Sequence, residues 1–166
     1  MLQIDNLALT GPAEEKQRKA VGGGVVKAAA CDYTFATQKS DIKLSEIAIG
    51  IGPFVIEPAV SRKIGKTALA EMTLTPTLWK SANWANEKGL FTEVFDTIEA
   101  LDNRLENYTN ELAKYNKEAL ADMKKVLWEG TDNWDSLLYE RAAISGRLVL
   151  SDFTKKALEK FKKWEV

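Results

Sequence analysis

The sequence contains no histidine and a single cysteine, Cys31, among its 166 residues. Without histidine, the chain cannot form a catalytic triad built on imidazole or a zinc site with imidazole ligands. One cysteine excludes a disulfide within the chain and is typical of a reducing compartment.

Long apolar runs and an excess of charge are also absent. No run approaches the ~18 apolar residues of a membrane-spanning helix, and the first residues lack the basic start and apolar core of a secretory signal. The formal net charge of −1 gives no electrostatic case for nucleic-acid binding. We therefore expect a soluble cytoplasmic protein, and its 45% apolar residues are enough to bury a core.

The stretch from residue 21 to residue 54 carries the most informative pattern. Three consecutive glycines, Gly22, Gly23 and Gly24, precede an alanine-rich run, and this order predicts a buried helix over 22–31. Glycines before a helix let backbone N–H groups approach a ligand closely. Those groups lie unpaired at the positive end of the helix dipole, so they can bind an anion or a developing oxyanion.

One carboxylate follows about twenty residues later. Glu46 lies where a predicted strand gives way to the glycine-punctuated turn at residues 50–53. An oxyanion donor and one carboxylate are sufficient for acid–base chemistry beside a carbonyl. On spacing alone, three glycines more often mark a turn or close packing, and an acid after a strand is more often solvated.

The order of these features resembles the crotonase (enoyl-CoA hydratase/isomerase) superfamily. The similarity rests on the glycine triplet, the small-residue run, Cys31-Asp32, the aromatic strand, Glu46 and Pro53, and then Arg62 to Gly65, Leu74-Thr75 and Ala85 to Leu90. It covers about residue 20 to the end, which corresponds to the C-terminal two-thirds of the family. Residues 1–20 resemble nothing known, and the family's usual N-terminal part, which supplies strands and a second oxyanion donor, is missing or replaced.

The resemblance implies an α/β fold with a ClpP/crotonase-like core. We expect a core with a small sheet over residues 1–90, incomplete at its N-terminus, and an all-helical oligomerisation region over residues 91–166. The family's C-terminal helices pack around a three-fold axis, so the implied assembly is a trimer or a dimer of trimers.

The resemblance also assigns a site. Gly23 matches the middle glycine of the family's triplet and is the implied oxyanion donor, while Glu46 is the implied acid and base. The implied substrate is an acyl-CoA thioester of fatty acid metabolism, with coenzyme A as part of the substrate, no separate cofactor and no metal. The implied substrate-binding residues are Gly22, Gly24, Val26, Ser45, Ile49 and Phe54.

One departure from the family bears on the reaction. Family hydratases carry a second glutamate two residues after the glycine triplet, where this chain has Val26. In this respect the chain is similar to the family's Δ3,Δ2-enoyl-CoA isomerases. Allylic isomerisation needs one base that moves a proton between two carbons, and it needs no water. The residues therefore favour isomerase-like chemistry over hydration.

Two alternatives to an active enzyme remain at this level. The chain is either a truncated, catalytically impaired crotonase homologue with a structural or oligomerisation role, or a small helical scaffold with a fortuitous glycine turn. A carboxylate of Glu46 within reach of a cavity lined by the Gly23 N–H would favour the enzyme.

Several local expectations complete the prediction. Strands are expected over 32–37 and 41–44 in one small sheet on the 22–31 helix, with helices over 54–64, 66–73 and 77–88 and four or more helices after residue 94. Apolar residues at spacings of three and four predict one of these from Ile98 to Tyr115, Gly130 ends the next, and Ser151 and Asp152 cap the last. Asp32 is expected to accept backbone hydrogen bonds, and Arg62 and Lys63 to be surface charges. We expect Trp128, Trp134 and Trp164 to contribute to oligomer contacts.

Overall fold

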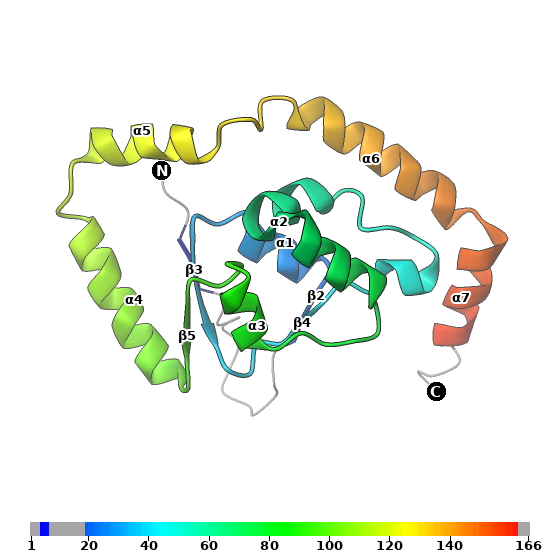
Figure 1. Ribbon diagram of the computed structural model, residues 1–166, viewed down its shortest axis with the longest axis horizontal. Coiled ribbons are helices and arrows are strands. Elements are labelled where there is room, and N and C mark those ends of the chain that lie inside the picture. Colours follow the sequence, from blue (N-terminus) through cyan, green and yellow to red (C-terminus); the bar gives the residue numbers. More distant parts are fainter. Residues whose placement is uncertain (1–3, 7–18, 163–166) are drawn as a thin grey trace.

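The computed structural model describes residues 4–6 and 19–162, and the side chains of residues 19–160 (Figure 1). An α/β body carries the short strands, and a series of helices extends around it. The elements of the body are β1 (Ile4–Asn6), β2 (Ala20–Val21), α1 (Gly23–Ala29), β3 (Tyr33–Thr37), β4 (Ile42–Lys43), the 3₁₀ helix η1 (Glu46–Ile49), α2 (Glu57–Leu74), α3 (Ala82–Glu87) and β5 (Glu93–Phe95). The helical arm comprises α4 (Ile98–Leu112), α5 (Lys117–Leu127), α6 (Trp134–Val149) and α7 (Asp152–Lys162).

The strands form two small parallel sheets. One sheet has the order β1-β3-β5, and the other pairs β2 with β4. The prediction of one sheet containing 32–37 and 41–44 is therefore wrong. After β3 the chain makes a turn in which Ser40 N donates a hydrogen bond to the Thr37 carbonyl at 3.0 Å. It then pairs with β2 and forms an isolated bridge between Ile42 and Lys80.

Helix α1 lies at the centre of the core, as its small residues predict. Val25, Ala28 and Ala29 are fully buried, and the contacts of α1 include both β2 and α2. Alanine side chains allow this close approach on several sides at once. The helix therefore anchors the glycine turn that precedes it.

Helix α2 confirms the two predicted helices, although it begins at Glu57 rather than residue 54. Pro58 occupies its first turn, where a missing N–H costs no helical hydrogen bond. Gly65 has φ +76° and ψ 161°, so the helix is kinked there, between the two predicted segments. The kink follows from the freedom of glycine to adopt positive φ.

The next predicted helix, over 77–88, is shorter in the structure. Helix α3 begins at Ala82 because Ser81 caps it, accepting a hydrogen bond from Trp84 N at 3.1 Å. The preceding Lys80 forms the bridge with Ile42, and Gly89, with φ +82°, follows the end of the helix. Strand β5 then pairs with β3, and this strand was not predicted because three residues show too little periodicity.

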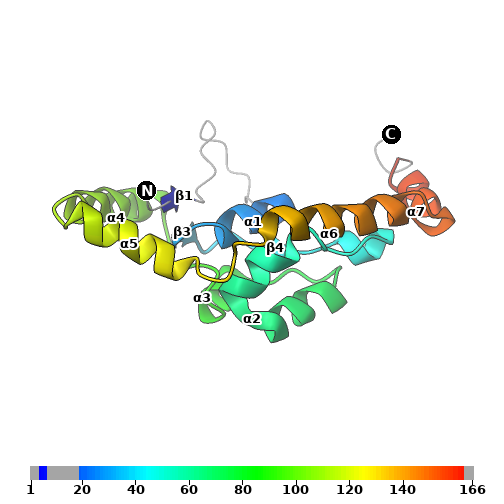
Figure 2. The ribbon, with the colours of Figure 1, turned by 90° about the horizontal axis from the view of Figure 1, so that it is seen from above.

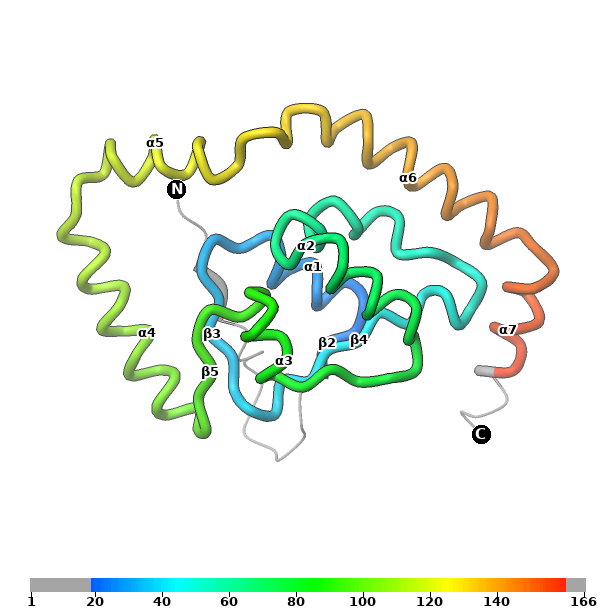
Figure 3. The backbone as a smooth tube through the Cα atoms, in the orientation of Figure 1, coloured from blue at the N-terminus to red at the C-terminus, as the bar shows by residue number. Residues whose placement is uncertain are grey.

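Helices α4 to α7 form an arm that runs along one end of the body at α4, over its long side at α5 and α6, and down the opposite end at α7 (Figures 1 and 3). Seen from above, the arm and the body form a flat, elongated molecule, with α2 and α3 on one side of α6 (Figure 2). The arm packs against β3 and β5 through α4 and against η1 through α7. Both ends of the arm are thus attached to the α/β body.

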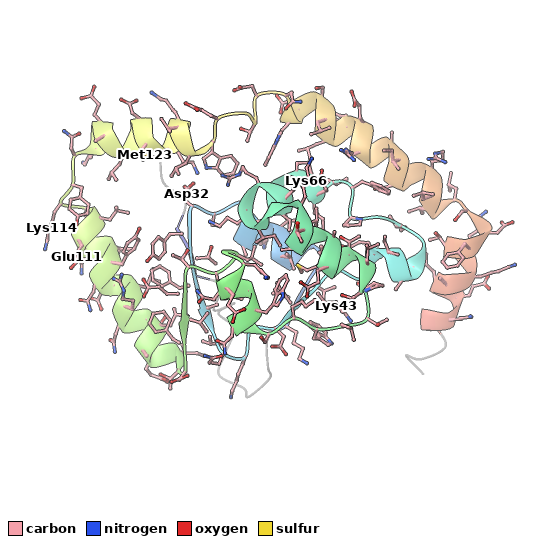
Figure 4. The ribbon with its side chains drawn as sticks, viewed as in Figure 1. Asp32, Lys43, Lys66, Glu111, Lys114 and Met123 are labelled. Atoms are coloured by element: carbon pink, nitrogen blue, oxygen red, sulfur yellow. The ribbon has the colours of Figure 1, made fainter. Side chains whose placement is uncertain are left out.

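Side-chain contacts fix the middle of the arm. The Asp32 carboxylate accepts hydrogen bonds from Trp128 Nε1 at 2.7 Å and Lys124 Nζ at 2.6 Å, and Figure 4 shows Asp32 on the side of the body that faces α5. The Trp128 and Trp134 rings lie edge to face with centroids 5.9 Å apart. These two tryptophans therefore pack against each other within the chain. Their contribution to oligomer contacts stays a prediction, and Trp164 lies outside the described residues.

Candidate active site at the glycine turn

Gly22 has a conformation that few other residues tolerate, with φ 51° and ψ −104°. Its N–H donates to the Lys43 carbonyl at 3.2 Å, and its own carbonyl accepts from Val25 N and Val26 N at 3.0 and 3.2 Å. A Cβ placed on Gly22 would lie 2.7 Å from Glu46 Oε1. The glycine is therefore required both for the backbone angle and for the approach of the carboxylate.

The next two glycines present free donors. The N–H groups of Gly23 and Gly24 begin α1 and bind no acceptor among the residues that the structure describes. Gly23 is exposed, and a Cβ there would meet no atom within 4 Å. This open helix start has the chemical character of an oxyanion site.

Glu46 is the first residue of η1, and its side chain is half-buried. Burial raises the pKa of the Glu46 carboxyl, while backbone N–H groups of Glu46 and Ser45 partly offset that rise. Its Oε2 atom is buried and has no hydrogen-bond partner in the described part of the chain. A carboxyl with an unused buried oxygen and a raised pKa is suited to accept and return a proton.

The other predicted site residues have less distinctive environments. Val26 and Ile49 are half-buried, and so is Ser45, which precedes η1 without a side-chain capping bond. The ring of Phe54 lies against Gly52, where a Cβ would come within 2.5 Å of it. The structure thus brings Gly22 and Glu46 together, whereas contact of the other side chains with substrate stays a prediction.

The contacts of Phe153 and Thr154 with Gly50, close to Glu46, were not predicted. A Cβ placed on Gly50, just after η1, would overlap Phe153 and Thr154 of α7. The predicted cap at Ser151 is confirmed, because its Oγ accepts from Thr154 N at 3.3 Å. The approach of this cap to Gly50 joins residues about a hundred positions apart, and no sequence pattern indicates such a contact.

The basic pair on α2, Arg62 and Lys63, binds other segments of the chain. Arg62 Nη1 donates to the Leu127 carbonyl at 3.0 Å, and its guanidinium lies 4.1 Å from the centre of the Trp128 ring. Lys63 Nζ donates to the carbonyls of Cys31 and Asp32 at 2.9 and 3.2 Å. The expectation of surface charges is therefore wrong for both residues. Asp32 is structural as predicted. Its carboxylate, however, binds the side chains of Lys124 in α5 and of Trp128, the residue after α5, rather than backbone groups.

Membrane-spanning helices and metal clusters are both absent from the described residues. None of the described helices has the length and apolar character of a membrane span. Among the same residues, no cluster of three or more acidic or cysteine side chains has the arrangement of a metal site.

Comparisons with known proteins agree with the sequence resemblance. A family model described as enoyl-CoA hydratase/isomerase matches residues 17–162. Enoyl-CoA hydratase/isomerase from Pseudoalteromonas atlantica T6c superimposes with a TM-score of 0.78 at 16% identity, over 89% of this chain and 59% of that chain. An enoyl-CoA hydratase from Mycobacterium avium gives 0.75 at 25% identity, over 89% and 58%. The enoyl-CoA hydratase from Bacillus halodurans gives 0.78 at 24% identity, over 86% and 57%.

No curated protein sequence is significantly similar to the chain. The chain spans less than two thirds of the length of the solved structures that it matches. Because the family model covers nearly all of the sequence and the solved relatives share its fold, the chain belongs to the enoyl-CoA hydratase/isomerase family and carries a crotonase-like fold.

Proposed function

We propose that the chain acts on an acyl-CoA thioester by proton transfer through Glu46, and that it moves a double bond rather than adding water. The observation that carries the proposal is the position of the Glu46 carboxyl against Gly22, which precedes the N–H groups of Gly23 and Gly24 that have no acceptor among the described residues. Family membership supports a thioester of coenzyme A as the substrate class.

The proposed reaction needs one carboxylate and one donor. Glu46 takes a proton from the α carbon of a 3-enoyl thioester, and the C–H electrons form an enolate whose oxygen accepts a hydrogen bond from Gly23 N–H. The γ carbon then takes the same proton back from Glu46. The double bond moves from the β,γ position to the α,β position, and no other reactant is consumed.

Val26 favours this reaction over hydration. It lies on the first turn of α1, where an apolar side chain provides no acceptor to orient a water molecule. Among the described residues, Glu46 is the carboxylate that lies against the glycine turn. Without a second carboxylate at the position of Val26, attack by water lacks a group to position it. We therefore expect slow hydration of a 2-enoyl-CoA.

Isomerisation of a 3-enoyl-CoA, followed by absorbance of the conjugated product, tests the proposal. Glu46→Gln keeps the shape of the side chain and removes the base, so the rate should fall ~10²–10⁴-fold. Val26→Glu should raise the ratio of hydration to isomerisation. Full isomerase turnover by Glu46→Gln would contradict the proposal, and so would efficient hydration of crotonyl-CoA by the wild type.

A second candidate function is favoured by the surface of the arm. Large apolar side chains are exposed there, including Met123, Val126, Tyr139 and Leu150, and such a surface is typical of an interface. The alternative is a catalytically impaired member of the family that serves in assembly as a homo-oligomer. Binding of acyl-CoA without any turnover of 3-enoyl or 2-enoyl substrates would favour this alternative.

A further inference from the structure

The first turn of α7 lies directly on the backbone of Gly50. A Cβ built on Gly50 would meet Phe153 Cδ1 at 2.5 Å and Thr154 Oγ1 at 2.7 Å. Those positions are closer than a side-chain atom tolerates, so α7 fills the space that any other residue would need. Gly50 also has φ +84°, in the region that favours glycine. Figures 1 and 3 show α7 beside the segment that contains η1.

Gly50 is connected to Glu46 by one short turn. Gly50 N donates to the Ile47 carbonyl at 3.0 Å, and Ile51 N donates to the carbonyl of Glu46 itself at 3.0 Å. Ala48 N donates to the Ser45 carbonyl at 3.1 Å. Because these bonds leave the turn little internal freedom, a displacement of Gly50 moves the backbone of Glu46.

Thr154 is held firmly while it makes this contact. The residue is fully buried, and its Oγ1 lies 3.2 Å from Ser151 Oγ. Ser151 also accepts from Thr154 N and, through its carbonyl, from Lys155 N at 3.1 Å. Phe153, by contrast, is 65% exposed and touches Gly50 with one edge of its ring. The start of α7 is therefore a fixed surface against which the η1 turn rests.

We propose that Phe153 and Thr154 are positioning residues for the Glu46 carboxyl. They press on Gly50 at the C-terminal end of η1, while Gly22 lies against Glu46 Oε1 at its N-terminal end. With both ends fixed, the carboxyl stays inside the turn and Oε2 stays away from solvent. The importance of this contact for catalysis rests on the proposed function, but the contact itself is tested without turnover.

The direct test is the pKa of Glu46 in the folded protein, followed by ¹³C NMR of labelled glutamate carboxyls. The Glu46 signal is assigned by its loss in Glu46→Gln. If α7 holds the turn in place, Phe153→Ala and Thr154→Ala let the carboxyl reach water, and its pKa falls by about half a unit or more. Thr154→Ser retains the hydroxyl and should restore most of the shift.

A distant destabilising change separates positioning from general loss of stability. Leu101 is fully buried at the start of α4, so Leu101→Ala should lower the melting temperature and leave the pKa of Glu46 unchanged. Because Phe153 is mostly exposed, Phe153→Ala should fold normally. An unchanged pKa in folded Phe153→Ala and Thr154→Ala would overturn the proposal.

Turnover gives an independent readout. If Glu46 is the base, Phe153→Ala and Thr154→Ala should lower kcat about tenfold with little change in KM, because the base moves while binding contacts remain. If Phe153→Ala and Thr154→Ala shift the pKa of Glu46 but the wild type has no isomerase activity, the positioning role stands and the proposed reaction is rejected. An altered KM with an unshifted pKa would assign α7 to substrate binding and reject the positioning role.

Discussion

Glu46 links the chemistry of the site to the stability of the fold. Burial raises the pKa of its carboxyl above the ordinary value of 4.5, so the folded state holds this proton to a higher pH than the unfolded chain does. Between 4.5 and the raised pKa, the folded state binds more protons, and the free energy of unfolding therefore falls as pH rises.

This sign predicts a stabilising substitution. Glu46→Gln removes an ionisable group whose charged form is penalised by burial, so the variant should be more stable than the wild type at neutral pH. Below pH 4.5, where the wild-type carboxyl is protonated, the difference should largely disappear. Urea unfolding from below pH 4.5 to neutral pH measures the free energy of unfolding of the wild type and of Glu46→Gln. Glu106→Gln, on the exposed side of α4, is the control for the loss of a charge. A destabilised Glu46→Gln at neutral pH would contradict the account.

At the scale of elements, the attachment of α5 depends on Asp32. Its carboxylate accepts two hydrogen bonds from α5 and Trp128, and its side chain is 6% exposed. Asp32→Ala leaves Lys124 and the Trp128 indole without this acceptor, and should lower the free energy of unfolding by about 2–3 kcal/mol. Hydrogen exchange in α5 should accelerate in parallel.

The same helix provides a matched control. Asp122 pairs with Lys125 at 2.7 Å, but both side chains are mostly exposed. Asp122→Ala should therefore change the stability by no more than about 0.5 kcal/mol. Equal effects of the two substitutions would show that the Asp32 pair does not hold the arm.

The sequence predicted elements well where the pattern was local and long. The spacing of apolar residues predicted α4, and Gly65 and Gly130 correctly separate helical segments. The partners of Asp32 were not predictable, because Lys124 and Trp128 follow it by 92 and 96 residues. The pairing of β3 and β4 with different neighbours was missed for the same reason, since parallel strands are joined by distant segments.

The residues of the candidate site were indicated by the sequence, whereas the segments that surround them were not. The glycine triplet and Glu46 were identified from the sequence, and the structure places Gly22 against that carboxylate. The contact of Gly50 with α7 depends on how the arm returns to the body. Helical periodicity gives the length of each arm helix but not the path that the arm follows.

At the scale of the whole molecule, the arm predicts self-association. Leu150 is 70% exposed at the end of α6, near other exposed apolar side chains. We expect light scattering to give a trimer or hexamer, and Leu150→Asp to lower the measured mass because a buried charge opposes the interface. Leu74 on α2 is 72% exposed, so Leu74→Asp is the control. A wild type that is monomeric at micromolar concentration would contradict this prediction.

In the proposed reaction, the glycine turn and Glu46 together form an enolate from an acyl-CoA. Hydrogen–deuterium exchange at the α carbon of a saturated acyl-CoA in D₂O measures this step alone, because it needs neither a double bond nor a leaving group. We expect the wild type to catalyse the exchange and Glu46→Gln to catalyse it ~10²–10⁴-fold more slowly, with unchanged acyl-CoA affinity. Equal exchange rates for the two proteins, or no exchange by a wild type that binds the acyl-CoA, would contradict the proposed reaction.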